Sequence, residues 1–598
     1  MKLRLVLIAA FATLIAFAGF STQAIAASGG TASATKLEKN VKKAEKKAKS
    51  QCKKAKKVKK SKNASAKAKK KANKNCTKAK KNVKKLKKQL KVYNQQFFDV
   101  CKHGCKYTTV QKGADAAGIW HFKNKKRPAT VRVQPGKYVE GVLMHGKQEG
   151  RNYNDLTIEG VKKDGVTPNP DARQVILDGT NAQTVVKGTP GWLPGDAPTI
   201  PANNAIEGRS ITGLKLKNMW GRHYQNNTFF IWASHEAADQ ELCKDFVMDN
   251  LVSSDTRSYG LFSRNCFGGK FLNSEGWNHG DSALYIGETP CDDPAWTNRT
   301  TAANKVPCQA KPDWTIVKNF TSHQNVLGYS GTNSKYVNIS DSSFFNNGAG
   351  IVPNTLDSEK FEPSGDLVLE NNDIFWNNYN YYQGKNGGSE FETVENPNAD
   401  THYPIGIGVV LYGTDGVTVQ NNNIFGNEKW GAANFSGPEL FDINQGDDAK
   451  NLNNHFINNN MGRNGTDPNG NYDFFSDASG GGNCWSGNTA SADFAPGNGS
   501  TPLSTIYPAC PQATVGNLDV PSFNFSAGLQ INAAYLPPAD PSNDPSTIFG
   551  YATQHPPLNM ECSMTLGTPH PAFTNAKGVK FTEKRANPVP PASCPVYP

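Results

Sequence analysis

The sequence is poor in methionine and, beyond its N-terminus, in long apolar runs. Methionine accounts for 7 of the 598 residues, against 55 glycines and 10% aromatic residues, a balance that favours a β-rich, loop-rich protein. No segment after the first 26 residues approaches the apolar length that a membrane span needs, about 20 residues. We therefore expect the mature chain to be soluble.

The one long apolar run lies at the N-terminus and is typical of a secretory signal. Lys2 and Arg4 precede an apolar run over residues 5–20, and "AIA" at 24–26 supplies a small-residue cleavage box. We interpret residues 1–26 as a signal peptide rather than a membrane anchor, because the run is short and ends in a cleavage pattern. Export to the extracellular space or the cell envelope permits disulfides, and twelve cysteines, an even number, fit that compartment.

Acidic residues are almost absent from residues 36–91, which hold 27 lysines and two glutamates, a net charge of +25. The whole chain carries +15, so the remainder carries −10. The chain therefore consists of a basic arm, which we place at residues 27–92, and an acidic body.

The basic arm has a helical period. Two apolar seams with alternating steps of four and three mirror each other, as in an antiparallel coiled-coil hairpin with its turn near residues 62–65. Cys52 and Cys76 would then face each other, and we predict a disulfide between them. The seam positions are Leu37, Val41, Ala44, Ala48, Ala55 and Val58, then Ala72, Cys76, Ala79, Val83, Leu86 and Leu90.

A disordered lysine tail is the alternative, because like charges at helical spacing oppose folding and an alanine-rich seam offers little apolar area. In either state the arm should bind polyanions, with anionic cell-wall polymer or acidic polysaccharide favoured by export. No aromatic residues interleave the lysines and no nucleic-acid motif is present, so we expect no specific nucleic-acid recognition.

The body contains a repeat of 22 or 23 residues. Segments such as "KFLNS", "YVNISDSSFFNN" and "VTVQNNNIFGNE" align on one polar residue, usually asparagine, with an apolar residue two positions earlier. Two of these aligned residues, Asn273 and Asn319, are 46 residues apart, which is either two units or one unit with an insertion. The anchors are Asn250, Asn273, Asn319, Asp341, Asn371, Asn421 and Asn458, and their apolar partners are Met248, Phe271, Val317, Ile339, Leu369, Val419 and Phe456.

Units of this length with short alternating strands fit one rung of a coiled parallel β structure. Hexapeptide left-handed helices need about 18 residues per rung, and the framework of leucine-rich repeats is absent. In the later copies a second asparagine follows six positions after the anchor. These second asparagines are Asn325, Asn347, Asn377, Asn427 and Asn464.

Stacking of rungs explains the asparagines. Equivalent residues of parallel rungs lie ~4.8 Å apart, and an amide both donates and accepts, so stacked asparagines can chain hydrogen bonds along the axis. Asparagine also tolerates a left-handed backbone at a sharp corner. We predict structural ladders formed by Asn250, Asn273, Asn319, Asn371 and Asn421, and by Asn325, Asn347, Asn377 and Asn427.

The same register places two cysteines together. Cys243 and Cys266 each lie seven positions before an anchor, so they should stack on adjacent rungs close enough to bridge. The remaining cysteines are paired by their nearness along the chain. These pairs are Cys101–Cys105, Cys291–Cys308 at the base of an insertion, Cys484–Cys510 and Cys562–Cys594.

Several segments are similar to one known fold family. They are "TTVQKGADAAG" (108–118), "VRVQPGKYVEGVLM" (131–144), "LTIEGV" (156–161), "VILDGTNA" (175–182), "GDSALYIGE" (280–288), "LGYSGTNS" (327–334), "AGIVPNT" (349–355) and the "NNNIFGN" rungs. Over about residues 100–480 the chain resembles the right-handed parallel β-helix proteins of the pectate-lyase-like superfold, and more narrowly secreted bacterial β-helix repeat proteins.

The resemblance implies an all-β, right-handed parallel β-helix over residues 93–484, with 108–118 as its N-terminal cap helix and 131–144 as its opening rung. Beyond it, we predict that the Pro/Gly-rich residues 485–598 form a disulfide-stapled tail or cap, since an uncapped β-helix end is an exposed sheet edge. The superfold does not specify activity: its members include polysaccharide lyases, hydrolases, epimerases and proteins with no assigned activity.

The strongest departure from the repeat is "EGWNHGDSALYIGE" (275–288), where His279 takes the position of the second asparagine. A histidine, a carboxylate and an arginine on adjacent rungs suit proton abstraction from a uronate or glycoside hydrolysis. The alternative is that His279 is a ladder substitute and Asp281 a turn residue. The candidate catalytic residues are His279, Asp281, Arg257, Asp255 and His323, and the candidate ligand-binding residues are Tyr285, Glu288 and Tyr329.

"NHGD" resembles the Gly-His-Gly site of β-helix polygalacturonases, but the second-carboxylate and Arg-Lys motifs of that family are missing. Asp292 and Asp293 would offer hard oxygen ligands for Ca²⁺ together with Asp281, without the spacing of a calcium loop. His235 and Glu236 do not form the HExxH pattern of a zinc site.

Two functions follow from these features. The first is a secreted enzyme that processes acidic polysaccharide in a groove along the rungs. The second is a non-catalytic envelope or adhesion protein, fastened to anionic wall polymer by the lysine-rich arm. The incomplete catalytic set favours the second, and the habits of the fold favour the first; carbohydrate contact is common to both.

Overall fold

The computed structural model divides the chain into two compact units, Met1–Asn94 and Gln95–Pro598. It describes residues 30–93, 96–124, 127–146, 148–234, 243–290, 313–356, 359, 361–379, 406–427, 429–435, 450–469, 472–476, 480–489, 509–510 and 573–581. Some sequence predictions fall outside the described residues. They concern the signal peptide, most of the tail, His235, Glu236, Asp292, Asp293 and the pairs Cys291–Cys308 and Cys562–Cys594.

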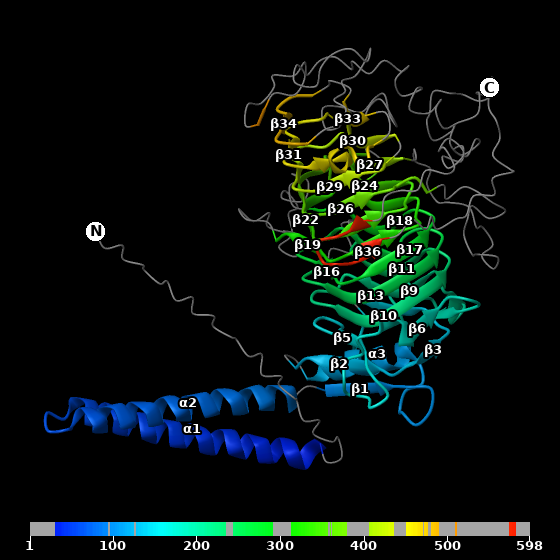
Figure 1. The fold of residues 1–598 in the computed structure, drawn as a ribbon. Helices are drawn as coiled ribbons and strands as arrows, with labels where there is room; N and C mark the ends of the chain where they lie inside the picture. Colours follow the sequence, from blue (N-terminus) through cyan, green and yellow to red (C-terminus); the bar gives the residue numbers. More distant parts are fainter. Residues whose placement is uncertain are drawn as a thin grey trace, which may run out of the picture. The chain divides into compact units, whose positions relative to one another are not determined.

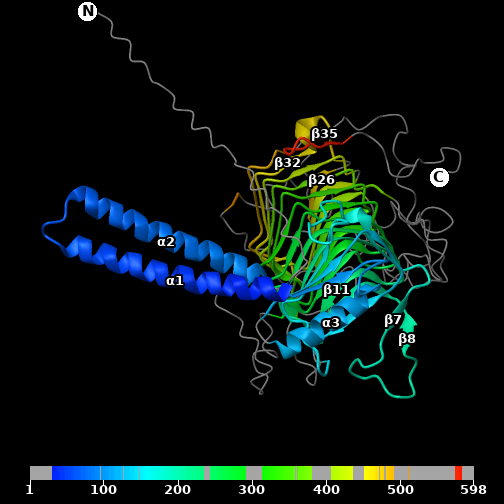
Figure 2. The ribbon, with the colours of Figure 1, turned by 90° about the horizontal axis from the view of Figure 1, so that it is seen from below.

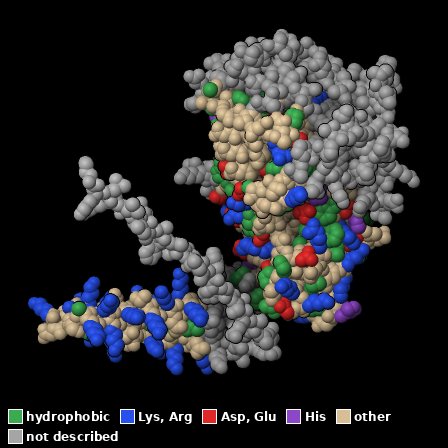
Figure 3. Space-filling model, viewed as in Figure 1, with side chains coloured by type: hydrophobic (Ala, Val, Ile, Leu, Met, Phe, Trp, Pro, Cys, Tyr) green, Lys and Arg blue, Asp and Glu red, His purple; other side chains and the backbone are tan. Residues whose placement is uncertain are grey.

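The lysine-rich arm is a helical hairpin, not a disordered tail. Helices α1 (Gly30–Lys60) and α2 (Ala66–Tyr93) are joined by a turn at residues 61–65, and the predicted disulfide Cys52–Cys76 links them with a Cα–Cα distance of 4.7 Å. The seam positions are buried or half-buried wherever their side chains are described, because they face the partner helix. Lysine side chains project from the rest of the surface (Figure 3).

The second unit is a parallel β-helix, in which three columns of strands stack rung on rung (Figures 1 and 2). The first column contains β1 (Gln96–Val100), β2 (Ala129–Val133), β5 (Thr157–Gly160), the first halves of β10 (Lys215–Tyr224) and β13 (Val247–Thr256), β16 (Lys270–Leu272), β19 (Thr315–Lys318), β22 (Lys335–Ser340), β25 (Gly365–Glu370), β28 (Thr418–Gln420), β31 (His455–Ile457) and β34 (Cys484–Ser486).

The second column follows each first-column strand after a sharp corner. It contains β3 (Gly136–Tyr138), β6 (Val175–Asp178), the second halves of β10 and β13, β17 (Glu275–His279), β20 (Thr321–His323), β23 (Ser343–Phe345), β26 (Asp373–Phe375), β29 (Asn423–Phe425) and β32 (Asn460–Met461).

The third column closes each rung. It contains β4 (Val142–His145), β9 (Asn204–Arg209), β11 (Asn227–Trp232), β14 (Leu261–Arg264), β18 (Ser282–Gly287), β21 (Leu327–Thr332), β24 (Ala349–Asn354), β27 (Ile407–Tyr412), β30 (Trp430–Phe435) and β33 (Tyr472–Ser476). Short additional elements lie in the turns that join the columns. They are β7 (Gln183–Val185) with β8 (Thr199–Pro201), β12 (Cys243–Lys244) with β15 (Cys266–Phe267), η1 (Ala172–Gln174) and η5 (Gly462–Gly465).

The register of the first column confirms the repeat. The seven apolar residues that precede the anchors, from Met248 to Phe456, pair in one unbroken series and are all fully buried. Phe271 pairs directly with Val317, so the step of 46 is one rung with an insertion rather than two rungs. Stacking of these side chains forms the interior of the solenoid.

The anchor residues turn the chain from the first column into the second. Asn250, Asn273, Asn319, Asn371 and Asn421 all have φ between 52° and 56°, the left-handed region that asparagine tolerates. Their side chains are half-buried or exposed, and only part of the predicted ladder exists: the Asn319 amide donates to Asn273 Oδ1 (2.8 Å). The main role of the anchors is therefore to form the corner. The prediction of a continuous ladder at this position is wrong.

The buried ladder lies one residue later. Asn372 Nδ2 donates to Asn422 Oδ1 (3.1 Å), and Asn422 Nδ2 donates to Asn459 Oδ1 (3.0 Å). Each of these carbonyl oxygens also accepts the backbone N–H of the preceding rung, 2.9 Å to Asn422 and 3.0 Å to Asn459. The side chain after the corner points inward, so it satisfies backbone groups that water cannot reach.

The predicted second ladder is present between the second and third columns. Asn325, Asn347, Asn377 and Asn427 are fully buried, and each Nδ2 donates to the next Oδ1 at 2.9–3.1 Å. Asn427 donates to Asn469 Oδ1 (3.1 Å). Asn464, the second asparagine of the last aligned copy, does not continue this ladder. The short helix η5 lies in this turn, and Asn469, five residues later, takes the ladder position.

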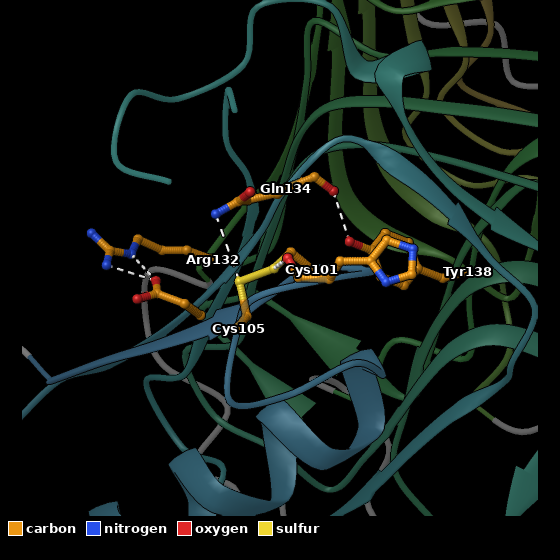
Figure 4. The surroundings of a disulfide bond; sticks show 7 residues. Cys101, Cys105, Arg132, Gln134 and Tyr138 are labelled. Carbon is orange, nitrogen blue, oxygen red and sulfur yellow. Dashed lines mark hydrogen bonds and ion pairs between the residues drawn. A yellow bond between two sulfur atoms is a disulfide. The ribbon is translucent and has the colours of Figure 1, made fainter. Parts of the chain in front are cut away.

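The N-terminal end is covered as predicted by a cap helix, α3 (Val110–Lys123), whose first turn is capped by Thr109 Oγ1 (Figure 2). The disulfide Cys101–Cys105 lies beside the opening rung, with Gln134 Nε2 3.7 Å from Cys105 Sγ (Figure 4). Cys243–Cys266 joins adjacent rungs with a Cα–Cα distance of 4.7 Å, and Cys484–Cys510 ties the tail to the last described rung.

The described part of the tail packs on the side of the β-helix. A hairpin of β35 (Phe573–Thr574) and β36 (Lys580–Phe581), drawn in red in Figure 1, lies against the second column. The sequence predicts that the tail packs on or caps the last rung. Its described hairpin packs on earlier rungs instead. None of the helices among the described residues has the length and apolar character of a membrane span.

Asn427→Ala should lower the free energy of unfolding by about 2 kcal/mol or more, because Asn377 and Asn469 would lose their buried partner. Urea denaturation followed by circular dichroism measures the change. The control is Asn421→Gly, which replaces an exposed corner residue at φ 56° by one that adopts this angle freely. Equal midpoints for Asn427→Ala and the wild type would contradict a stabilising ladder.

Candidate functional site

The outward face of the second column carries two parallel rows of side chains. At the fourth position after the five anchors from Asn273 to Asn421, five rings pair in register and stack along the axis. Neighbouring rings are 5.0–5.7 Å apart and 3–21° from parallel, so their edges point outward. We call them the ring row: Trp277, His323, Phe345, Phe375 and Phe425.

Polar groups flank the N-terminal part of this row. Glu275 Oε1 lies 3.2 Å from His323 Nε2, and the Arg173 guanidinium forms an ion pair with Glu275 Oε2. The same guanidinium lies 5.5 Å from the centre of the Trp277 ring. Burial acts to raise the pKa of Glu275, but the hydrogen bond and charge of His323, together with Arg173, lower it below its usual value. This carboxylate is therefore ionised and half-buried beside an imidazole.

Trp220 extends the aromatic surface toward the N-terminus. Its ring centre is 6.0 Å from that of Trp277. Its Nε1 donates to Oγ of Ser254 (3.0 Å), the β13 residue that pairs with Trp277. Arg222 lies 4.7 Å from the centre of the Trp220 ring. Both indoles are half-buried, so part of each ring is open to a ligand.

A cluster of acid and histidine side chains lies at the adjoining corner. His223 Nδ1 is 3.4 Å from Asp178 Oδ1, and His223 Nε2 is 4.0 Å from Asp255 Oδ2. His223 and Asp255, with φ of 61° and 55°, lie at equivalent positions of neighbouring rungs, because the residues on either side of them pair in register. We call Asp178, His223 and Asp255 the corner cluster.

Asp178 is the fully buried member of the corner cluster. Its Oδ2 accepts from Arg222 Nε (2.9 Å) and pairs with Lys137 Nζ (3.0 Å), and its Oδ1 accepts from the Thr180 amide (3.0 Å). Burial acts to raise the pKa of this carboxyl, but the hydrogen bonds of His223, Lys137 and Thr180 hold it well below its usual range. Asp178 thus stays ionised and orients His223.

His279, the main catalytic candidate from the sequence, faces the interior. Its imidazole is fully buried, with Nδ1 2.6 Å from Thr256 Oγ1 and Nε2 3.0 Å from Ser253 Oγ. Its backbone N–H donates to Asn325 Oδ1 (2.9 Å), so it occupies the first position of the second ladder. Burial lowers its pKa to about 3, which keeps the ring neutral. This position favours the ladder role over the catalytic one.

The structure separates the other candidate catalytic residues. Asp255 and His323 lie on the outward second-column side, in the corner cluster and the ring row. Asp281 is buried in the turn before the third column, and Arg257 lies half-buried in the turn of the preceding rung. The predicted constellation around His279 is therefore not one site.

The candidate ligand-binding residues are divided in the same way. Tyr329 is fully buried in the core, where its hydroxyl donates to Ser334 Oγ (3.3 Å). Tyr285 lies on the outer side of the third column, and its hydroxyl donates to Glu359 Oε2 (2.6 Å). Glu288 accepts Nε and Nη2 of Arg264 at 2.6 and 2.8 Å and is fully buried.

The described residues contain no group of three or more His, Cys, Asp or Glu side chains placed to hold a metal ion. Asp292 and Asp293, on which the calcium prediction rests, lie outside these residues, so Ca²⁺ remains a prediction.

Several residues of the face did not stand out in the sequence. Arg173, Trp220 and Arg222 belong to no recognised motif, Glu275 opens the segment 275–288 but is not itself among the candidates, and Asp178 lies in "VILDGTNA" without a spacing that marks it. One signal was available: the fourth residue after the anchor is a ring in five successive rungs. The residue before each ring, three positions after the anchor, is apolar and points inward in the later rungs. Because side chains alternate along a strand, the ring itself is predicted to point outward.

No protein-family model matches the chain, and no curated protein matches it. Solved structures similar to it include the A-modules of two mannuronan C-5 epimerases of Azotobacter vinelandii, AlgE4 (11% identity, TM-score 0.37) and AlgE6 (13%, 0.39). Each match covers 66% of this chain, and 96% and 93% of the epimerase chains. The catalytic unit of a GH87 α-1,3-glucanase from Streptomyces thermodiastaticus matches at 12% identity and a TM-score of 0.30, over 65% of this chain and 67% of that one.

His279→Asn should make the protein less sensitive to acid. The native imidazole, with a pKa of about 3, stays neutral while the unfolded one binds a proton below about pH 6.5, so wild-type stability falls as the pH drops through this window. The contribution of this residue is at most about 1.4 kcal/mol per pH unit. The free energies of unfolding of His279→Asn and the wild type, measured by urea denaturation at several pH values, should approach each other between pH 7 and pH 4. The control His103→Asn, at an exposed site, should follow the wild type.

Proposed function

We propose that the second-column face from β6 to β20 binds a polysaccharide lying along the axis of the β-helix. The observation that carries this proposal is the presence of two half-exposed indoles, Trp220 and Trp277, among paired acids, bases and imidazoles on successive rungs. Aromatic rings supply apolar contact for the C–H faces of sugars, and planar polar side chains exchange hydrogen bonds with hydroxyl groups. Rungs spaced ~4.8 Å apart repeat these contacts for a long ligand.

The charges of the face are balanced. Lys137 and Arg173 are about half exposed, at 50% and 49% of their side chains, and pair with Asp178 and Glu275. A uronate carboxylate can compete for either cation, and hydroxyl groups can bind the remaining donor sites. The face therefore suits both acidic and neutral polysaccharide, within the broader proposal that the protein binds or processes polysaccharide.

Two acid–imidazole pairs on this face have the geometry for proton transfer. They are Glu275 with His323 at 3.2 Å and Asp178 with His223 at 3.4 Å. An imidazole held by a carboxylate is a common general base or acid. Any processing activity should therefore depend on these pairs rather than on the interior His279.

Trp277→Ala should abolish or strongly reduce binding without unfolding the β-helix, since the indole lies on the surface of the rung. Retardation in gels containing polygalacturonate, alginate or xylan measures binding. The matched control is Trp314→Ala, a partly exposed indole that packs on Tyr336 before the first-column strand β19 and should bind as the wild type. Equal retardation of all three proteins would contradict the proposal.

Incubating the protein with the same three polysaccharides in solution separates binding from processing. New reducing ends or unsaturated products that disappear in Glu275→Gln support an enzyme. Retained binding with no product across the panel supports the non-catalytic alternative.

A second role is favoured by the lysine-rich hairpin. Its described side chains include many exposed lysines and one ion pair with an acid, Lys87–Glu45 (2.7 Å), so most of the positive charge is open to a polyanion. We propose that α1 and α2 fasten the exported protein to an anionic wall polymer. The four disulfides of the described residues suit the oxidising compartment that this role requires.

Removing residues 27–92 should abolish binding to polyglutamate or teichoic acid at low salt and leave the behaviour of the body in polysaccharide gels unchanged. Full-length binding should weaken steeply as NaCl rises from 50 mM to 500 mM, because exposed charges are screened. Binding that ignores ionic strength would overturn the electrostatic assignment.

A further inference from the structure

The ring row continues beyond the open face and is then covered by a segment from far along the chain. The hairpin β35–β36 lies over Phe345, Phe375 and Phe425. Its rings, Phe573 and Phe581, meet the ring row at centroid distances of 4.8–5.2 Å and angles of 62–72°. The outward edges of the row thus point at the faces of the hairpin rings, the edge-to-face arrangement that aromatic pairs prefer.

The hairpin is attached by side chains rather than by strand pairing. Among the described residues, β35 and β36 pair with each other in a sheet separate from the three columns. Lys577 Nζ donates to Asn319 Oδ1 (2.7 Å) and to the Asp341 carbonyl, both at the corner between the first and second columns. An isolated two-stranded hairpin is at best marginally stable in water, so its place depends on these few contacts.

The covered part of the face has the same chemical pattern as the open part. Asp373 lies two positions before Phe375, as Glu275 lies two positions before Trp277, and both carboxylates point outward beside a ring. Asn423 Nδ2 donates to Asp373 Oδ1 (2.8 Å). A polar row beside an aromatic row therefore continues beneath the hairpin without a break in register.

Resting on the polysaccharide-binding function proposed above, we propose that the hairpin of residues 573–581 occupies the C-terminal part of the binding face and limits how many sugar residues the face holds. The hairpin rings fill the space in which a longer glycan would contact Phe345, Phe375 and Phe425. A chain that displaces the hairpin gains three further rungs, whereas a short oligosaccharide fits on the open rungs and does not meet it.

The test compares ligands of two lengths on intact protein. The double variant Phe573→Ser/Phe581→Ser removes both covering rings, and Lys577→Ala loosens the attachment without changing any ring. Val579→Ser is the matched control, since Val579 lies in the same hairpin, is 50% exposed and contacts none of the ring row. Binding of xylan, alginate and polygalacturonate, and of trisaccharides from each, is measured by gel retardation and calorimetry, with thermal unfolding as the check on folding.

We expect the double variant to bind the polymer on the order of tenfold more tightly than the wild type, with a smaller gain for Lys577→Ala. Trisaccharide affinity should stay unchanged in all variants. This dependence on length separates an extended face from the general adhesiveness of exposed phenylalanines, which would raise the affinity for both ligands.

Each outcome decides between the two proposals. If the wild type binds the polymer and no hairpin variant binds it more tightly, the hairpin does not limit the face. The polysaccharide-binding function then still stands. Polymer binding by the variants alone overturns binding on the open rungs and leaves the site beneath the hairpin as the one that holds glycan. No binding by any protein, with folding intact, overturns both, because the hairpin would then cover no glycan site.

Discussion

The architecture depends on how the chain satisfies backbone amides at its corners. Each rung turns sharply twice between its three strands, and the backbone amides that point inward beside these turns, such as those of Asn372 and Asn422, are out of reach of water. Asparagine side chains supply the missing partners in two ladders. One Oδ1, as in Asn377, accepts both the backbone N–H and the side-chain amide of Asn347 on the preceding rung, at 3.2 and 3.1 Å. The stacking of rungs is thereby held by side chains as well as by strands.

The ladders have a consequence for the outer surface. A strand places alternate residues on opposite sides, so fixing the inward position of one residue fixes the outward positions on either side of it. Because Asn372 and Asn422 both point inward, the residues one and three positions after them point outward in register. The ring row and the polar row beside it follow from this constraint, whichever ligand they bind.

This constraint also explains how much the sequence could predict. The anchors from Asn250 to Asn458 align the rungs from β13 onward. They also predict the disulfide between Cys243 and Cys266, because each cysteine lies seven positions before an anchor. The spacing of Asn371 and Asn421 does not distinguish the corner residue from the ladder residue beside it, since "NN" occupies both positions in these rungs. Only the backbone angle shows that the first asparagine turns the chain and the second bonds the next rung.

The candidate site was harder to predict, for a physical reason. His279 breaks the asparagine pattern, yet an interior position accepts any side chain that satisfies the local hydrogen bonds. The outward residues Trp277 and Glu275 obey the pattern and so do not break the repeat. A departure from a repeat marks a change in packing at least as often as it marks chemistry, and residues that keep the register can still form a binding surface.

The distribution of charge separates two kinds of ligand contact within one chain. The segment of residues 36–91 carries +25 while the rest carries −10, so a polyanion is attracted to the hairpin and repelled on average by the body. On the body, the cations nearest the indoles, Arg173 and Arg222, are already paired with Glu275 and Asp178. An acidic chain must therefore replace existing ion pairs to bind there, whereas hydroxyl groups need only the unused donors and acceptors. In the functions proposed above, long-range attraction thus belongs to the hairpin, and recognition of sugar residues belongs to the short-range contacts of the second-column face.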